Sequence, residues 1–152
     1  MGVWCDCDAT LIVTHTLFLR APHYKSTVAL WLDANNMVGS IPTEIGRLTE
    51  LASLSITNGT LTGEIPTEMG NLSGLRRLWL YGNDLSGTIP TELEKCENLE
   101  VLELQRNDFE GEMPSKICAI IGIKEYQHKS LTVDCDTVAC AMPGCCTHCS
   151  TR

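Results

Sequence analysis

The sequence predicts an α/β fold, a short right-handed solenoid with a parallel β-sheet on its concave side and short helices or 3-10 turns on its convex side. Two observations lead to this prediction. A segment of 24 residues recurs about four times with its apolar and glycine positions in register, and the chain ends in a dense group of cysteines. Units that cannot bury their apolar faces alone become stable by stacking on one another.

The repeat is clearest in three strings, LWLDANNMVGSIPTEIG at 30–46, LSITNGTLTGEIPTEMG at 54–70 and LWLYGNDLSGTIPTELE at 78–94. The glycine before the Ile-Pro or Met-Pro pair returns every 24 residues, at Gly39, Gly63, Gly87 and Gly111. This spacing divides the solenoid, 27–122, into repeats at 27–50, 51–74, 75–98 and 99–122. Constant spacing indicates that each copy is one structural unit.

Each repeat is expected to contain a strand, a turn, a second extended segment and a short helical turn. Alternating apolar and polar residues, as in Leu30-Trp31-Leu32, predict a strand with one buried face. The Asn that follows, as at Asn83, can bond to backbone groups left open at the bend. The Thr-Glu pair after each Ile-Pro suits a helix start, where free N–H groups favour an acceptor and a negative charge. Repeat 2 has Gly59 in the place of the Asn, which predicts a looser turn there.

The complete pattern, LxxLxLxxNxLxGxIPxxLGxL, resembles the leucine-rich repeat, and its GxIP and LGxL segments resemble the plant type. This resemblance implies a recognition domain whose concave strands carry the binding residues. It further implies the ectodomain, or a piece of one, of a receptor-like protein whose membrane span and kinase domain lie elsewhere.

Caps are expected at both ends, an irregular one at 1–26 with a partial strand around Leu17 and Leu19, and a cysteine-rich one at 123–152. Leu131 and Val133 are interpreted as a last strand, displaced from the 24-residue register by an insertion of five residues. The string IC at 117–118, followed by LTVDC and CCTHC, resembles the terminal caps of leucine-rich-repeat proteins from algae such as diatoms. The disulfide candidates are Cys118, Cys135, Cys140, Cys145, Cys146 and Cys149, with Cys118 tying the tail to the stack.

The cysteines also allow other readings. Cys146 and Cys149 form a CxxC pair, which Cys135 and Cys140 could complete as a zinc site, whereas no βαβ context supports a thioredoxin-like pair. Cys96 takes the register position of Leu72, which favours a buried, inert thiol. We predict no metal and no cofactor.

Composition restricts the partners and the location. The net charge is −8 and no basic run is present, which argues against nucleic-acid binding. The longest apolar candidate, 9–19, is too short to span a bilayer, and the acidic CDCD before it does not suit a signal peptide. The chain is therefore intracellular, or its export signal lies outside this stretch. The sequons at Asn58 and Asn71 favour glycosylation and an extracellular or cell-surface location.

The predicted binding site is the set of side chains that point away from the core on the concave strands. Small Ser55 between two exposed tryptophans would leave a shallow dip, suited to a peptide side chain or a sugar ring. The alternative is that the tryptophans only cover neighbouring apolar surface. Trp, Tyr and Arg often anchor interfaces. The candidate ligand-binding residues are Trp31, Asp33, Ser55, Thr57, Arg77, Trp79, Tyr81, Glu103 and Gln105.

No catalytic motif emerges, because a serine nucleophile motif, a phosphate-binding glycine loop and HExxH are all missing from the sequence. The favoured function is non-enzymatic recognition of a protein, peptide or glycan. The alternatives are a secreted structural or inhibitor protein, and a metal-binding or redox role of the cysteine tail.

Overall fold

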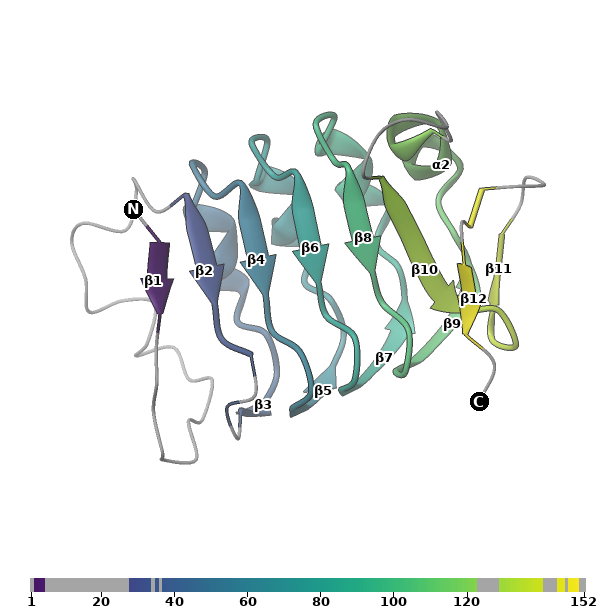
Figure 1. The fold of residues 1–152 in the computed structure, drawn as a ribbon, viewed down its shortest axis with the longest axis horizontal. Coiled ribbons are helices and arrows are strands. Elements are labelled where there is room, and N and C mark those ends of the chain that lie inside the picture. The colour runs from purple at the N-terminus through teal and green to yellow at the C-terminus, as the bar shows by residue number, and fades with distance from the viewer. Residues whose placement is uncertain are drawn as a thin grey trace.

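The computed structural model describes residues 2–4, 28–33, 35, 37–122, 129–140, 145, 146 and 148–150. These residues form two parallel sheets and a row of short helices, stacked along one axis as a short solenoid (Figure 1). The seven-stranded sheet has the order β1-β2-β4-β6-β8-β10-β12, and the five-stranded sheet has the order β11-β9-β7-β5-β3. The predicted fold class is confirmed.

Each repeat contributes one strand to each sheet and one helix. The strands of the seven-stranded sheet are β1 (Gly2–Trp4), β2 (Ala29–Trp31), β4 (Ser53–Ser55), β6 (Arg77–Trp79), β8 (Val101–Glu103), β10 (Ser130–Asp134) and β12 (His148–Ser150). Those of the five-stranded sheet are β3 (Val38–Gly39), β5 (Thr60–Gly63), β7 (Asp84–Thr88), β9 (Asp108–Glu112) and β11 (Val138–Ala139). The helices are the 3-10 turns η2 (Thr43–Arg47), η3 (Thr67–Asn71) and η4 (Thr91–Lys95), and α2 (Ser115–Ile121).

Strand pairing follows the 24-residue repeat. Leu30 pairs with Leu54, Leu54 with Leu78, and Leu78 with Leu102. Leu131 then pairs with Leu102 across 29 positions, the 24 of the repeat plus five. The insertion predicted before the last strand is therefore confirmed.

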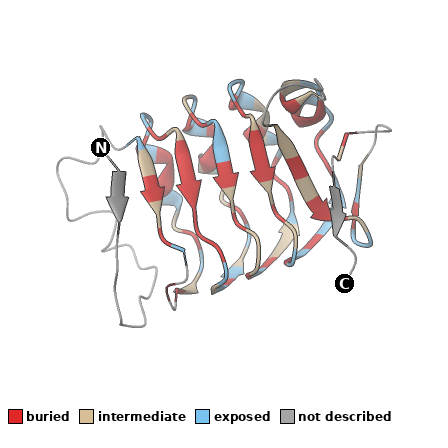
Figure 2. Ribbon diagram, viewed as in Figure 1, coloured by how far each residue is buried: buried red, intermediate tan, exposed pale blue. Residues whose placement is uncertain are grey.

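The core lies between the sheets and the helices, and the inward residues of every repeat fill it (Figure 2). Leu54, Leu78 and Leu131 have no exposed surface. Full burial of one leucine side chain contributes about 1.5–3 kcal/mol. The strands β2, β4, β6, β8 and β10, called here rungs 1 to 5, therefore depend on their neighbours for much of their stability.

Asparagines connect the turns as a ladder. Asn107 Nδ2 donates to the carbonyls of Leu104 at 2.8 Å and Leu80 at 3.0 Å, while its Oδ1 accepts from Leu85 N at 3.1 Å. Asn83 makes the equivalent bonds one repeat earlier. Each amide thus satisfies backbone groups of its own repeat and of the preceding one, as the sequence predicted.

Repeat 2 keeps the turn geometry although it lacks the ladder Asn. The residue before the Asn place is left-handed in three consecutive repeats, with φ 53° at Asn58, 70° at Gly82 and 60° at Arg106. The backbone at this position therefore does not show the looser turn expected for repeat 2.

The helix starts differ from the expectation. Pro42, Pro66 and Pro90 are the N-cap residues, and none of these caps includes a side-chain hydrogen bond. Thr67 Oγ1 instead donates to the carboxylate of Glu68 at 3.3 Å. The threonine lies inside the first turn, one residue too late to cap it, and only the acidic residue meets the expectation for a helix start.

Both ends of the stack extend the seven-stranded sheet. β1 pairs with β2, which adds a strand that the sequence analysis did not predict, while Leu17 and Leu19 lie outside the described residues. At the other end β12 pairs with β10. Disulfides join Cys118 to Cys145 and Cys140 to Cys146, and Cys135 is also disulfide-bonded. The expected link between tail and stack is the Cys118–Cys145 bond.

Close packing of neighbouring 3-10 turns makes Gly46 sensitive to substitution. A Cβ at Gly46 would lie 2.6 Å from Glu68 O and 2.8 Å from Glu68 Cβ. Gly46→Ala should therefore lower the free energy of unfolding by about 1–3 kcal/mol, measured by denaturant titration.

Gly74→Ala is the matched control, because an added Cβ there comes no closer than 3.6 Å to Thr49 O. It should change the stability by less than about 1 kcal/mol. Equal losses in the two variants would contradict close packing as the cause.

Candidate functional site

The candidate site lies on the outward side of the seven-stranded sheet, called here the concave face. Five rungs place one strand-end residue each on this face, at Asp33, Thr57, Tyr81, Gln105 and Asp134. The rungs differ in exposure. Arg77 is exposed and Tyr81 is half-buried, whereas Ser55 and Thr57 are each only 4% exposed.

Trp31 and Trp79 form a stacked pair, with ring centroids 5.3 Å apart and planes inclined by 29°. Their strands, β2 and β6, are separated by β4, a span of about 9.6 Å at the usual strand spacing. The indoles must therefore lean toward each other above the strand that carries Ser55. Both rings remain half-buried, so part of their surface faces solvent.

This pair corrects the expected shallow dip. Ser55 lies on the middle strand of the three and is buried. The two large side chains beside it gain contact by closing over the small one, because aromatic pairs attract each other and the gap would otherwise be filled by water. The outward feature at this place is therefore a pair of aromatic rings, Trp31 and Trp79, called here the aromatic platform, rather than a dip.

Asp33 explains why Thr57 is also withdrawn from the surface. Its Oδ1 accepts hydrogen bonds from Ser55 Oγ, from Thr57 N at 3.1 Å and from Thr57 Oγ1 at 2.8 Å. Ser55 and Thr57, predicted to contact a ligand, are thus used inside the protein, and Asp33 has an internal role although it is exposed. A sequence pattern cannot reveal these hydrogen bonds, because the three residues come from two repeats.

Asp134 belongs to the same row and was missed by the sequence analysis. The pairing of Thr132 with Glu103 places it beside Gln105, and it is only 4% exposed. Its Oδ2 accepts from Asn107 N at 3.1 Å, while Asp134 Oδ1 and Gln105 Oε1 are buried acceptors that find no hydrogen-bond partner among the described residues. The five-residue offset of the last strand was the signal that could have identified it.

Two polar hollows lie away from the concave face. One of about 280 Å³ is lined by Thr43, Glu44, Gly46, Arg47, Glu68 and Asn71. The other, of about 300 Å³, is lined by Arg76, Glu97, Asn98, Leu99, Glu100, Ile120 and Lys129. Small-molecule sites are usually lined mainly by apolar side chains, so neither hollow has the character expected of one.

An ion pair at the second hollow joins Arg76 Nη2 to Glu100 Oε1 at 2.6 Å. The hydrogen bond from Arg76 is the main reason that the pKa of Glu100 lies below its usual value. Because the Arg76 side chain is 55% exposed, water and salt screen the pair, and it contributes little stability.

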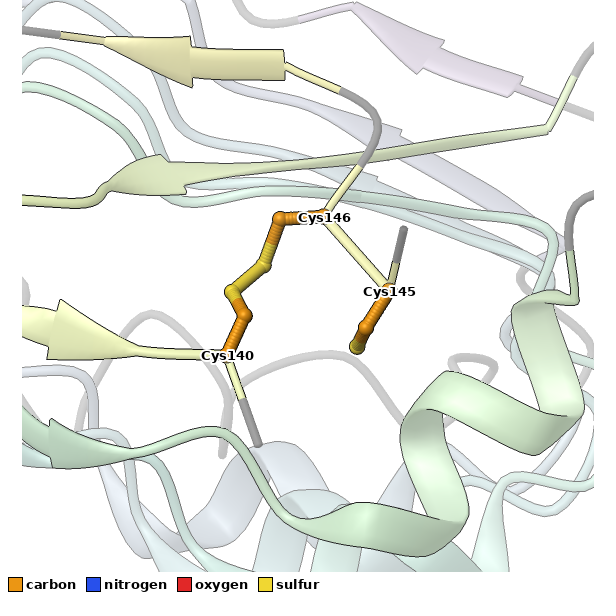
Figure 3. A group of neighbouring side chains, drawn as sticks. All are labelled: Cys140, Cys145 and Cys146. Carbon is orange, nitrogen blue, oxygen red and sulfur yellow. A yellow bond between two sulfur atoms is a disulfide. The ribbon is translucent and has the colours of Figure 1, made fainter. Parts of the chain in front are cut away.

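The described cysteines of the tail are disulfide-bonded and give the candidate zinc site no free thiolate. The sulfur atoms of Cys140, Cys145 and Cys146 lie within 4.8 Å of one another (Figure 3). All three are disulfide-bonded, as is Cys135. A zinc ligand must be a thiolate, so Cys135, Cys140 and Cys146 are not available to zinc in this oxidised form. Cys149 was the fourth candidate, and its side chain lies outside the described residues.

Comparison with protein families identifies two of the repeats. A family model described as Leucine Rich Repeat matches residues 74–96 and 98–120. A comparison with curated proteins gives no match.

Several solved structures resemble the chain. The plant peptide hormone receptor RGFR1, in complex with RGF2, is 34% identical over 76% of this chain and 17% of its own, with a TM-score of 0.62. The ectodomain of the receptor kinase SOBIR1 from Arabidopsis thaliana is 27% identical over 77% of this chain and 61% of its own, with a TM-score of 0.64. A plant ice-binding protein is 36% identical over 70% of this chain and 35% of its own, with a TM-score of 0.60.

The chain is shorter than these neighbours. It covers 16% of the TDR receptor and 61% of the SOBIR1 ectodomain, the extremes among eight similar structures. The neighbours include both receptors and an ice-binding protein. The fold alone therefore leaves the ligand open, and the outward side chains must decide it.

The stacked indoles should be detectable in solution. Two indoles 5.3 Å apart couple their electronic transitions, so the native protein should show an exciton couplet in circular dichroism. Trp31→Phe and Trp79→Phe should each abolish it, whereas Tyr81→Phe, which keeps both indoles, should retain it. A couplet that survives Trp79→Phe would place the coupling elsewhere.

Cys96 should be inert in the folded protein. It is the free cysteine among the described residues, has no exposed surface, and burial raises the pKa of its thiol to about 11. The reactive thiolate is therefore nearly absent at neutral pH. Alkylation with iodoacetamide followed by peptide mapping should leave Cys96 unmodified in the native protein and modify it after unfolding. Modification without unfolding would show that the site opens.

Proposed function

Since this chain is a leucine-rich-repeat protein of the plant type, we propose that it recognises a peptide ligand on its concave face as part of an extracellular or cell-surface receptor-like protein. The proposed role is binding without catalysis. The observation that carries this proposal is the Trp31–Trp79 pair, two half-buried indoles joined on the face that the repeats leave free.

A joined pair of indoles is a suitable anchor for a peptide. Aromatic side chains bury large apolar areas with little loss of conformational entropy, and Trp is enriched among residues that dominate binding energy. The stacking fixes both rings before a ligand arrives, which lowers the cost of ordering them on binding. The parts of the stacked rings that face solvent suit an apolar, proline or cationic side chain of a peptide.

The charges around the platform indicate the character of the peptide. The chain carries a net charge of −8, and Glu103 pairs across the sheet with Trp79. Exposed Arg77 lies two residues before Trp79 on the same strand face. A peptide with a basic residue near Glu103 and an acidic group or carboxylate near Arg77 would match this arrangement. Tyr81 and Gln105 extend the same face toward the strand ends.

Several observations support a location outside the cell. The tail contains disulfides, which persist in oxidising compartments. The two sequon asparagines, Asn58 and Asn71, are both exposed and could carry glycans. Within the described residues, no helix combines the length and apolar character needed to cross a membrane. The solved neighbours include a peptide hormone receptor in complex with RGF2.

Selection from a random peptide library displayed on phage tests the proposal. The library is panned on the wild-type protein, and the enriched peptides are synthesised and measured by biolayer interferometry. Trp31→Ala combined with Trp79→Ala should abolish their binding, because it removes the platform. Arg47→Ala, an exposed change in η2 on the convex side, is the control and should bind as the wild type does.

Apart from the indole couplet, the circular dichroism spectra of all three proteins must agree, which shows that the secondary structure is kept. Enriched peptides that bind the double Trp variant unchanged would refute the platform as the site. Failure to enrich any peptide, together with binding on a glycan array that needs both tryptophans, would replace the peptide by a sugar. Failure of both assays would favour the structural or inhibitor alternative.

A further inference from the structure

The C-terminal cap holds two disulfides in direct proximity. Cys118–Cys145 joins α2 to the tail, and Cys140–Cys146 closes a small loop within the tail. The sulfur atoms of Cys140, Cys145 and Cys146 lie within 4.8 Å of one another, although they belong to two different bonds (Figure 3). Proximity of this kind lets a thiol released from one bond reach the other.

The two bonds differ in their access to solvent. Cys118 and Cys145 are 6% and 8% exposed, whereas Cys140 and Cys146 are half-buried. A reductant in solution therefore meets the Cys140–Cys146 bond first. The Cys118–Cys145 bond is shielded from direct attack but not from its neighbours within the cap.

We infer that the two disulfides form a relay in which reduction of Cys140–Cys146 is passed on by exchange to Cys118–Cys145 and frees α2 from the tail. A dithiol reductant donates two electrons and two protons to Cys140–Cys146 and becomes a disulfide itself. The Cys140 thiolate then attacks Cys145 Sγ, so that a Cys140–Cys145 bond forms and the Cys145–Cys118 bond breaks. Cys118 leaves as a thiolate and takes up the proton that Cys140 released to solvent, without further electron transfer.

Chain geometry selects Cys140 rather than Cys146 as the attacking residue. Neighbouring Cα atoms are about 3.8 Å apart, below the usual disulfide range of about 4.4–6.8 Å, so a Cys145–Cys146 bond is disfavoured. Cys140 is already bonded to Cys146, six residues away, at a Cα–Cα distance of 6.3 Å. In the exchange its new partner, Cys145, is the residue next to its old one. The relay therefore needs only a local rearrangement of the tail.

The exchange would act on the end of the repeat stack. α2 buries Ile117 and Ile121 in the core, and Cys118 lies between them. Loss of the covalent link leaves α2 held to the stack by packing and by hydrogen bonds such as Lys116 N to Glu94 Oε1, while the tail keeps its own loop. The cap would thus respond to thiol reductants in its surroundings although its connecting bond is buried.

Partial reduction of the full chain tests the relay. The protein is treated with limiting dithiothreitol, quenched in acid, unfolded, alkylated with N-ethylmaleimide and mapped by peptide mass spectrometry. The relay predicts a species with a Cys140–Cys145 bond and alkylated Cys118 and Cys146. Cys96, a free thiol in the structure, provides the internal standard for alkylation.

The matched control is the double variant Cys140→Ser and Cys146→Ser, which lacks the half-buried Cys140–Cys146 bond but keeps Cys118–Cys145. At the dithiothreitol concentration that opens Cys118–Cys145 in the wild type, this bond should persist several-fold longer in the variant. Equal rates in the two proteins would overturn the relay. If the variant does not fold, the wild-type time course decides alone, because alkylation of both Cys140 and Cys146 with Cys118–Cys145 intact would equally refute it.

Discussion

The mutual dependence of neighbouring repeats underlies the whole structure. A three-residue strand cannot be stable alone, and here each one gains its hydrogen bonds and the burial of its leucines from the strands on either side. The asparagine ladder adds a second dependence, since Asn107 bonds to backbone groups of two repeats. Both interactions require a constant spacing of 24 residues. This requirement fixes the inward residues of each repeat but not the identity of the outward side chains.

That freedom explains the character of the concave face. Rungs 1 and 3 carry large residues, Trp31 and Trp79, while rung 2 carries small ones that its neighbours cover. The platform is therefore a product of three rungs and exists in none of them alone. Thr57 of rung 2 is fixed by hydrogen bonds from its N–H and its hydroxyl to the Asp33 carboxylate of rung 1. An interaction surface of this chain thus arises from the contrast between successive repeats.

The sequence predicted what depends on periodicity. Strand positions, the inward leucines, the Asn ladder and the displaced strand at Leu131 all follow from register and were read correctly. Contacts between repeats were not predicted, because the stacking of Trp31 on Trp79 and the burial of Ser55 depend on how side chains of different rungs lean. The proline caps of the 3-10 turns were missed because a shift of one residue decides whether a hydroxyl can reach the backbone. Disulfide pairing was open because six cysteines permit many pairings.

Glu94 has a consequence for how such a chain could grow. Repeats 1 and 2 carry Gly46 and Gly70 where the next 3-10 turn packs against them, whereas repeat 3 has Glu94 there. Glu94 Oε1 accepts a hydrogen bond from Lys116 N at 3.1 Å, in the first turn of α2. Repeat 3 therefore places the following helix through a side-chain hydrogen bond, where repeats 1 and 2 allow a close backbone approach at a glycine. Gene duplication could lengthen the stack upstream of it, but a unit inserted after it would meet a side chain where the others leave room.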